Sequence, residues 1–399
     1  MPTGEIVHHP DEFLATLHEK MKHINPGVED MELYEFRYAL DNLGPGKGGW
    51  ASVELASRGE IEKLVDDGSF YRRIQIKPKV DDRIVLDESI VRLTNMLLVG
   101  LVTGDYPEEW IAAHFYFDLR GFFFLHRTVY FTPGVLAHLG GRPFMRFEQR
   151  QKRFDRCQAI GYKDFKEANA EADRAFIESV RKLIAAKGTP ILLAIAGPTA
   201  AGKTEIAARL RTYCEEAVGA VASVEMDNFF TDRDYREQKG IYSLGREALH
   251  FELFKQSLSD LYRGKKVSIP RYDFVFATSS HDLQGRLKPG SVPIVIEPAD
   301  IIFIEGNSPF LFEEVAHLIG IKVVYLTDDP IRLKRKWRRD IDYRKKYEPT
   351  YFRNRFFKDQ FLMAEKCFRP QMELCDMVAD TTGAALWATP QIAEILERQ

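Results

Sequence analysis

The 399-residue chain lacks any long hydrophobic run. Its longest apolar stretches, around 96–102 and 122–125, fall far short of the roughly 20 residues needed to cross a bilayer, so we expect no membrane span. A basic surplus is also missing, because 56 Lys and Arg residues against 59 Asp and Glu residues give a formal net charge of −3. Nucleic-acid-binding proteins usually carry the opposite balance, so we expect no nucleic acid as the main partner.

Cysteine is scarce, and the four cysteines are spread without a CxxC pair. No secretory hydrophobic segment follows the first residues, which favours a location in the reducing cytoplasm. Internal repeats and low-complexity tracts are missing too, and the 45% of hydrophobic residues is near the average of globular proteins. Because a single core rarely serves more than about 250 to 300 residues, this length predicts two domains.

The clearest internal boundary is a helical pattern over about 163–187, where apolar residues recur at intervals of three or four. Gly188 and Pro190 are residues typical of the end of such a helix. The chain is therefore expected to contain an amino-terminal domain (1–160), a connecting helix (161–188) and a carboxy-terminal domain (189–399).

Directly after this helix, Ile191–Ala196 forms an all-apolar run, short enough for a strand that is buried on both faces. Similar runs then alternate with helical patterns. This alternation predicts an α/β fold with a doubly wound parallel sheet, whose ligand site lies at the carboxyl ends of the strands. The further expected strands are 220–226, 300–305 and 322–326, and the expected helices are 205–216, 246–262, 310–319 and 330–346.

The first 160 residues show another pattern and carry no motif that indicates chemistry. Helical periodicity at 11–23 and 88–102 is accompanied by two aromatic strand candidates, 113–119 and 122–131, that are typical of a hairpin. This half therefore predicts a separate α+β domain of unknown role.

Within it, residues 71–79 alternate apolar and basic side chains, which would place Arg73, Gln75 and Lys77 on one face of a strand. Such a face could recognise phosphate groups. A solvated sheet face is the commoner explanation, and we favour it.

The strongest motif follows the strand Ile191–Ala196 and matches the phosphate-loop pattern GxxxxGK[ST]. Backbone N–H groups of such a loop and the amino terminus of the next helix converge on one polyphosphate, which predicts ATP and Mg²⁺ as cofactors and a P-loop NTPase fold. Lys203 would reach the β and γ phosphates, and the Thr204 hydroxyl would bind Mg²⁺. The alternative is a glycine-rich turn that only links strand to helix. The loop consists of Gly197, Pro198, Thr199, Ala200, Ala201, Gly202, Lys203 and Thr204.

Two acidic residues follow later strands of the predicted sheet. Asp227 stands just after 220–226, where it could accept a proton from an attacking hydroxyl, although an aspartate there could equally cap the next helix. Glu305 ends the strand 300–305, where an acidic residue can hold Mg²⁺ or its waters. An ordinary carboxylate at a strand end is the alternative for Glu305.

A run of cations lies between Lys334 and Lys346. Charged runs are usually solvated helix faces. Because this run follows a buried strand of the nucleotide domain, its arginines could instead neutralise charge on the transferring phosphoryl group, and we favour this interpretation.

Five segments, taken together, resemble uridine kinase and its phosphoribulokinase-like relatives over about residues 190–380. The resemblance implies that Asp227 is the catalytic base, that Glu305 lies near the metal and that Tyr272 lies in the acceptor pocket. It further implies a mobile lid in which we expect Arg335 to contact the nucleotide, Arg339 to assist catalysis with Lys203, and Arg344 to contact the acceptor. The five segments are 197–204, 227–230, 264–274, 298–306 and 338–340.

The chain departs from this family in the acceptor half. Leu244 stands where the family has an aspartate that grips ribose, and Ala277 stands where it has a histidine. Neither side chain can hydrogen-bond a nucleoside, so we expect the preference for uridine to be lost. The residues placed to recognise another acceptor are Arg246, His250, Arg271 and His281, whose cationic character hints at an anionic small molecule.

The sequence thus predicts an ATP-dependent kinase that phosphorylates a hydroxyl of a small metabolite other than uridine or cytidine. A nucleotide-sensing regulator, with the amino-terminal domain as its output, is the alternative from another class. A kinase acting on nucleic-acid ends is disfavoured by the net charge of −3. Related kinases often form homo-oligomers, but nothing in the sequence sets a number of subunits.

Overall fold

The structure is a computed structural model that divides into two compact units. The first unit comprises residues 1–129, 152–164 and 347–362, and the second comprises 130–151, 165–346 and 363–399. The residues that the structure describes are 5–25, 28, 31–40, 43–45, 48–66, 77–78, 84–85, 88–118, 122–126, 130–147, 169–241, 245–327 and 363–398.

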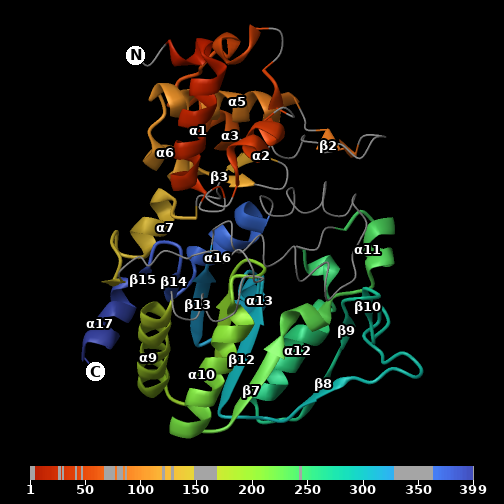
Figure 1. The fold of residues 1–399 in the computed structure, drawn as a ribbon. Helices are drawn as coiled ribbons and strands as arrows, with labels where there is room; N and C mark the ends of the chain where they lie inside the picture. The colour runs from red at the N-terminus through yellow and green to blue at the C-terminus, as the bar shows by residue number, and fades with distance from the viewer. Residues whose placement is uncertain are drawn as a thin grey trace. The chain divides into compact units, whose positions relative to one another are not determined.

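A seven-stranded sheet organises the second unit, in the order β5–β15–β14–β13–β6–β12–β7 (Figure 1). The run from β14 to β7 is parallel, whereas β15 and β5 add to one edge in antiparallel pairing. All six residues of β6, at the centre, are buried, as expected for an apolar strand covered on both faces. The strands are β5 (Met145–Arg146), β6 (Ile191–Ala196), β7 (Val221–Glu225), β12 (Ile301–Gly306), β13 (Ile321–Leu326), β14 (Met377–Asp380) and β15 (Ala385–Ala388).

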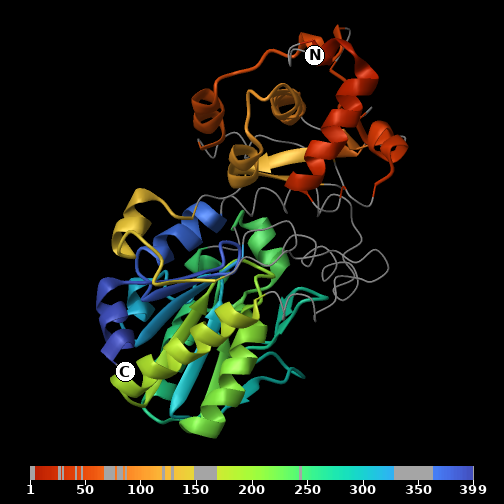
Figure 2. The same ribbon diagram turned by 60° about the vertical axis from the view of Figure 1, so that its left-hand side comes forward.

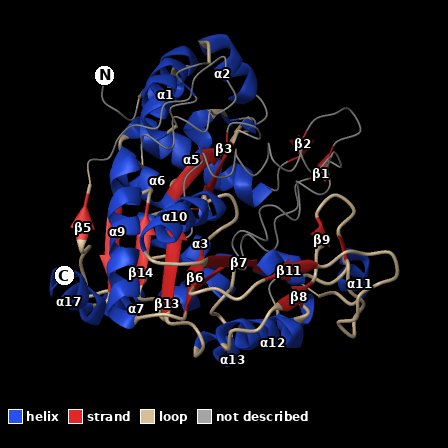
Figure 3. Cartoon of the chain, turned by 90° about the horizontal axis from the view of Figure 1, so that it is seen from below, coloured by secondary structure: helices blue, strands red, loops and turns tan. Residues whose placement is uncertain are grey.

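Helices cover both faces of this sheet (Figures 1 and 3). One face packs against α9 (Ala170–Lys187), α10 (Lys203–Ala217) and α17 (Pro390–Arg398) in a single apolar cluster. The opposite face carries a second apolar cluster, so the unit has the layered architecture of a doubly wound fold. That second cluster includes residues of α7 (Pro133–His138), α12 (Phe251–Tyr262), α13 (Glu313–Ala316), the π-helical turn Ala364–Phe368 and α16 (Arg369–Met372).

Shorter elements precede and follow α12 along the chain. The 3₁₀ turn η6 (Met226–Phe229) follows β7 directly and leads to α11 (Arg233–Gln238). After α12 come two small antiparallel pairs, β8 with β11 and β9 with β10. Neither pair follows from hydrophobic periodicity, because each strand has only two or three residues. Their bounds are β8 (Val267–Ile269), β9 (Tyr272–Asp273), β10 (Thr278–Ser279) and β11 (Ile294–Ile296).

The first unit is built around one buried helix, α5 (Glu88–Thr103), whose residues 93–102 are all buried (Figure 2). A helix that is apolar all round belongs in the middle of a core, which is where α5 lies. An added Cβ at Gly100 would overlap the ring of Tyr106, so the glycine permits this close packing. The other elements are α1 (Pro10–Ile24), α2 (Leu33–Leu40), α3 (Arg58–Asp66), α6 (Glu108–His114), the pair β1 (Lys77–Pro78) with β2 (Ile84–Val85), the hairpin β3 (Phe115–Asp118) with β4 (Phe123–His126), and the 3₁₀ turns Ile6–His8 and Trp50–Ser52.

The predicted α/β class and parallel sheet are confirmed, and α9 ends at Lys187 before Gly188, which has a φ of 79°. The expected helix over 246–262 was wrong in its first five residues, of which Arg246–Ala248 form a 3₁₀ turn. Leu249 instead forms a β-bridge with Phe230, and the backbone N–H of His250 donates to the Phe229 carbonyl, which delays α12 until residue 251.

Other expectations differ from the structure in smaller ways. The helix expected over 310–319 contains only the four residues of α13, and the strand expected from residue 113 begins at 115 because α6 continues to 114. Residues 130–147 belong to the second unit, where β5 pairs with β15, whereas the proposed division at residue 160 stays a prediction. The expected helix over 330–346 and the residues Arg73 and Gln75 lie outside the described residues. Within the described ranges, every helix falls short of the length and apolarity that a membrane span requires.

Phe303 offers a test of the sheet core, because it is 1% exposed on β12, which pairs with a strand on each side. We expect Phe303→Ala to lower the free energy of unfolding by about 3 to 5 kcal/mol, the usual loss for a buried phenylalanine. Phe276, which is 78% exposed, provides the matched control, and Phe276→Ala should change stability by less than about 0.5 kcal/mol. Equal losses in chemical denaturation would contradict this arrangement of the core.

Candidate active site

The phosphate-loop motif occupies the turn between β6 and α10, the strand–loop–helix context that the pattern requires. An added Cβ at Gly197 would overlap the backbone oxygen of Tyr325 on the neighbouring strand, so only glycine fits there. Ala200 and Gly202 have positive φ angles of 65° and 105°, and Gly202 caps the start of α10. The loop therefore closes tightly over a helix amino terminus, where backbone N–H groups and the helix dipole favour an anion.

Lys203 lies folded back against this loop. Its Nζ atom donates hydrogen bonds to the carbonyl oxygens of Gly197, at 2.7 Å, and Pro198, at 3.1 Å. A lysine ammonium makes three such donations from a flexible stem, so these contacts can be exchanged for phosphate oxygens.

Glu305 is the last residue but one of β12 and lies next to the first turn of α10. The Thr204 hydroxyl donates to its Oε1 atom at 3.2 Å, while its buried Oε2 atom has no hydrogen-bond partner within the described part of the chain. Burial, followed by the nearby Glu225 carboxylate, raises the pKa of Glu305 to about 7. A carboxylate with one oxygen buried and unpaired is a group that a cation would satisfy.

Sequence reasoning missed Glu225 as a site residue. It is the last residue of β7 and pairs in register with Glu305 of β12, so two carboxylates lie on adjacent strands. Loss of hydration and the nearby Asp227 raise the pKa of Glu225, and the Asn228 side-chain amide donates to its Oε2 atom at 3.4 Å. The signal in the sequence was an acid at a strand end, but nothing there shows that β7 and β12 are neighbours.

The Thr204 hydroxyl and the Glu305 carboxylate fit Mg²⁺, an ion that proteins usually hold through one or two oxygen ligands together with phosphates and water. The unpaired oxygen of Glu305 supports this fit. Among the described residues, no group of three or more His, Cys, Asp or Glu side chains is arranged to hold a metal. The remaining ligands would therefore come from nucleotide phosphates and water.

Asp227 lies in η6 and lines a small, open hollow, which we call the Asp227 hollow. The next helix, α11, has Asp232 at its N-cap, so Asp227 does not cap it. Asp227 is the one charged residue in a lining made by Met226, Asp227, Phe230, Gly245, Leu249, Asn307 and Ser308, all from the described residues. The hollow thus offers one carboxylate, two small polar side chains and an apolar wall.

Tyr272 contacts Phe230, an apolar lining residue of the hollow, but does not itself line the hollow. Its hydroxyl accepts a hydrogen bond from Arg236 at 2.8 Å, and its ring meets the Phe230 ring at a centroid distance of 5.8 Å. The Arg236 guanidinium, which is buried, lies 5.0 Å from the centre of the Phe230 ring. The structure therefore brings Tyr272 close to the lining of the Asp227 hollow, without placing it in the lining itself.

Arg246 and Arg271, both expected to bind the acceptor, lie on the exposed surface. Arg246 forms ion pairs with Glu314, at 2.9 Å, and with Glu252, at 3.0 Å, on the exposed surface. Arg271 is exposed, and its backbone N–H donates to the Ser280 hydroxyl at 2.8 Å. Neither arginine lines the Asp227 hollow.

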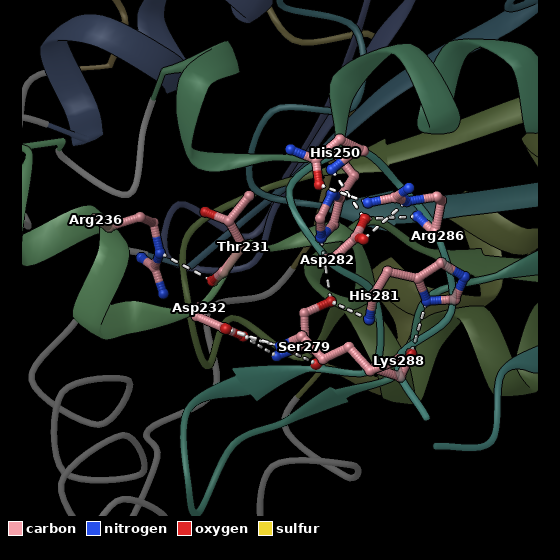
Figure 4. A network of polar contacts seen from close by, with 11 residues as sticks. Thr231, Asp232, Arg236, His250, Ser279, His281, Asp282, Arg286 and Lys288 are labelled. Atoms are coloured by element: carbon pink, nitrogen blue, oxygen red, sulfur yellow. Dashed lines mark hydrogen bonds and ion pairs between the residues drawn. The ribbon is translucent and has the colours of Figure 1, made fainter. Parts of the chain in front are cut away.

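His250 is buried in a polar network that Figure 4 shows. Its Nε2 atom lies 3.2 Å from the Ser279 hydroxyl, and Ser279 also donates its backbone N–H to Asp232 at 2.6 Å. Lys288 completes the network with an ion pair to Asp232 at 2.7 Å. These contacts attach β10 and the loop after it to the segment that follows Phe230, so the network supports the wall of the Asp227 hollow.

Several predicted residues cannot be placed. Arg335, Arg339, Arg344 and Leu244 lie outside the described residues. Ala277 is buried at the turn between β9 and β10 with a φ of 58°, and its carbonyl accepts a hydrogen bond from the Arg233 backbone N–H.

Comparison with known proteins explains why these features occur together. The Phosphoribulokinase / Uridine kinase family matches residues 192–386. A uridine kinase of Lactobacillus helveticus (strain DPC 4571) is 30% identical over 155 residues, which are 38% of this chain and 68% of that protein. The chain belongs to the phosphoribulokinase and uridine kinase family. Members of this family phosphorylate hydroxyl groups, so the chain is a phosphotransferase that acts on a small molecule.

Other proteins that resemble this chain are similarly distant. A uridine kinase of Brevibacillus brevis (strain 47) is 29% identical over 160 residues, or 39% of this chain and 69% of that protein. Among solved structures, a D-glycerate 3-kinase from Cryptococcus neoformans aligns over 54% of this chain and 97% of its own, with 12% identity and a TM-score of 0.37. The family match begins at residue 192, so the first unit lies outside it apart from residues 347–362.

The buried His250 predicts how stability depends on pH. Burial, and then the nearby His281, lowers the pKa of His250 from 6.5 to about 4, so the unfolded chain binds more protons than the folded chain between these pH values. The free energy of unfolding should therefore fall as the pH drops from about 6.5 to about 4, by roughly 1 to 3 kcal/mol from this residue.

His250→Gln should flatten that pH dependence, measured by chemical denaturation at several pH values. His317→Gln, at an exposed position, should leave the dependence as in the unaltered protein. A pH profile that is the same for all three proteins would show that His250 is not held neutral by the fold.

Proposed function

We propose that this kinase transfers the γ-phosphoryl group of ATP to a hydroxyl of a small metabolite bound in the Asp227 hollow. The observation that carries the proposal is the position of Asp227, which lines the hollow and follows a strand whose last residue pairs with Glu305. Glu305 in turn accepts a hydrogen bond from Thr204, the last residue of the phosphate loop. Thr204, Glu305 and Glu225 thus link the phosphate loop to the end of the strand that Asp227 follows.

In the proposed reaction, the phosphate loop and the amino terminus of α10 hold the polyphosphate, and Lys203 exchanges its carbonyl partners for the β and γ phosphates. Thr204 and Glu305 would hold Mg²⁺, which would neutralise charge on the phosphates. Asp227 accepts the proton of the acceptor hydroxyl as the hydroxyl oxygen attacks the γ phosphorus, and the bond between that phosphorus and the bridging oxygen breaks to release ADP. Arg339 and Arg335 act on the transferring group from the lid, as the family resemblance implies, and Arg344 contacts the acceptor.

We further propose that the acceptor is neither uridine nor cytidine, although the two relatives described above are named uridine kinases. The methyl side chain of Ala277 cannot hydrogen-bond a base, and Leu244 cannot accept bonds from ribose. A site that lacks the partners of a polar ligand selects against that ligand. An acceptor that carries a phosphate or carboxylate is also part of this proposal, and the buried Arg236 guanidinium, 5.0 Å from the centre of the Phe230 ring, would supply a cation near the wall of the hollow.

Asp227→Asn tests the catalytic role directly. We expect this variant to bind ATP as the unaltered protein does and to lose turnover by at least about 10²-fold, the contribution typical of general base catalysis. The measurements are nucleotide affinity by calorimetry and product formation from labelled ATP. Asp234→Asn, an exposed residue of α11, is the matched control and should keep full activity. Unchanged turnover in Asp227→Asn would contradict the proposal and favour a nucleotide-sensing role.

The acceptor class can be tested with a metabolite screen that uses labelled ATP and detects new phosphorylated products. Phosphorylated or acidic polyols should be phosphorylated faster than nucleosides. The Ala277→His variant should improve activity on uridine only if Leu244 is also changed to Asp, because both missing contacts lie on the nucleoside side. If uridine or cytidine proved the best substrate of the unaltered protein, the claim about the acceptor would be wrong, while the kinase assignment would stand.

A further inference from the structure

Glu225 has no role in the reaction described so far, but its position on β7 is defined. Residues two apart on a strand share a face, so Glu225 lies on the same face as Ser223 and Val221. The Ser223 hydroxyl accepts a hydrogen bond from Arg211 of α10 at 2.6 Å, and Val221 packs against the apolar cluster that contains α10. Glu225 therefore faces the side of the sheet on which α10 begins.

Glu305 faces the same side. It is two residues beyond Phe303, which belongs to the α10 cluster, and it receives the hydrogen bond from Thr204 in the first turn of α10. Because β7 and β12 are parallel and pair Glu225 with Glu305, the two carboxylates extend side by side toward that turn. Strands in a sheet lie about 4.8 Å apart, so the two acidic groups occupy one small volume.

Two adjacent carboxylates repel each other unless a cation lies between or beside them. Lys203 supplies one positive charge nearby, but Asp227 adds a third acidic group to the same strand ends. The buried, unpaired Oε2 atom of Glu305 is an independent sign that this cluster is completed by a ligand. A divalent ion would both balance the excess negative charge and bind the unpaired Oε2 atom of Glu305.

The strand order determines how Glu225 would contribute. β12 lies next to β6, which leads into the phosphate loop, whereas β7 lies one strand farther away. Glu305 is thus the closer ligand to Thr204, and Glu225 is set back by one strand spacing. Mg²⁺ in proteins keeps several of its waters, and a carboxylate set back in this way accepts hydrogen bonds from them.

We propose that Glu225 is a positioning residue for the catalytic metal, which it holds through metal-bound water beside Glu305. The inference rests on the proposed function, because it assumes that Thr204 and Glu305 bind the divalent ion that accompanies ATP. It adds a third acidic residue to the site, one that no motif in the sequence indicates. The Asn228 amide donates to Glu225 at 3.4 Å and would limit the orientations that this carboxylate adopts.

Glu225→Gln tests this role without relying on activity. Mn²⁺, followed by electron paramagnetic resonance, is the probe, and the full chain is saturated with a non-hydrolysable ATP analogue. We expect the dissociation constant for Mn²⁺ to rise about 10- to 100-fold, as is typical when a partner of a metal's ligands is lost. Without metal, in EDTA, the analogue should bind as tightly as before or more tightly, because one negative charge near the phosphates has been removed.

Glu216→Gln is the matched control, since it removes the same charge from an exposed position on α10 and should leave both constants unchanged. Glu225→Asp, which keeps the charge, should restore part of the Mn²⁺ affinity. Unchanged Mn²⁺ binding in Glu225→Gln would overturn the inference, as would an equal loss of metal binding and of metal-free nucleotide binding, which indicates general damage to the site. A different experiment tests the proposed function: full turnover in Asp227→Asn would contradict that function, whatever the result for Glu225→Gln.

Discussion

The parallel pairing of β6, β12 and β7 is the constraint on which the rest of the second unit depends. Apolar side chains on the two faces of the sheet hold these strands in place. Their registers place Ala196, Gly306 and Glu225 together at the carboxyl ends of the strands. The phosphate loop follows β6, Glu305 lies in the last two residues of β12, and Asp227 lies two residues after the end of β7. A change in the order of the strands would separate the three groups without altering a single motif.

Close backbone approach makes this arrangement possible. Gly197 lies so near the Tyr325 carbonyl that no side chain fits, and a Cβ at Gly306 would stand 2.7 Å from the Cβ of Met226. Gly197 directly follows β6 and Gly306 is the last residue of β12, so both lie where a strand of the sheet meets the candidate active site. The backbone segments at these strand ends can therefore pack closely together. This brings Thr204, after β6, near enough to Glu305 of β12 to form a hydrogen bond.

The parts of the fold that could be predicted are those with a local signal. The run Ile191–Ala196, the periodicity of α9 and the pattern of the phosphate loop each carry their meaning within a few residues. The exit of residues 249 and 250 from the expected helix could not be foreseen, because it results from pairing with Phe230 about 20 residues earlier. Glu225 was missed for the same reason, since its partner Glu305 is 80 residues away in sequence and becomes visible only once the strand order is known.

The contrast between the two ends of the site also has a physical origin. The phosphate end is built from backbone groups and strand termini, so its geometry follows from the sheet and tolerates little change. The acceptor end is walled by side chains such as Phe230 and Leu249, and the network from His250 through Ser279 to Asp232 and Lys288 supports that wall from behind. Side chains at such a wall can be exchanged while the network keeps the backbone in place. One sheet can thus retain a fixed way of handling ATP while the hollow beside Asp227 is adapted to a different hydroxyl, and that division is why the family relationship identifies the reaction more firmly than the acceptor.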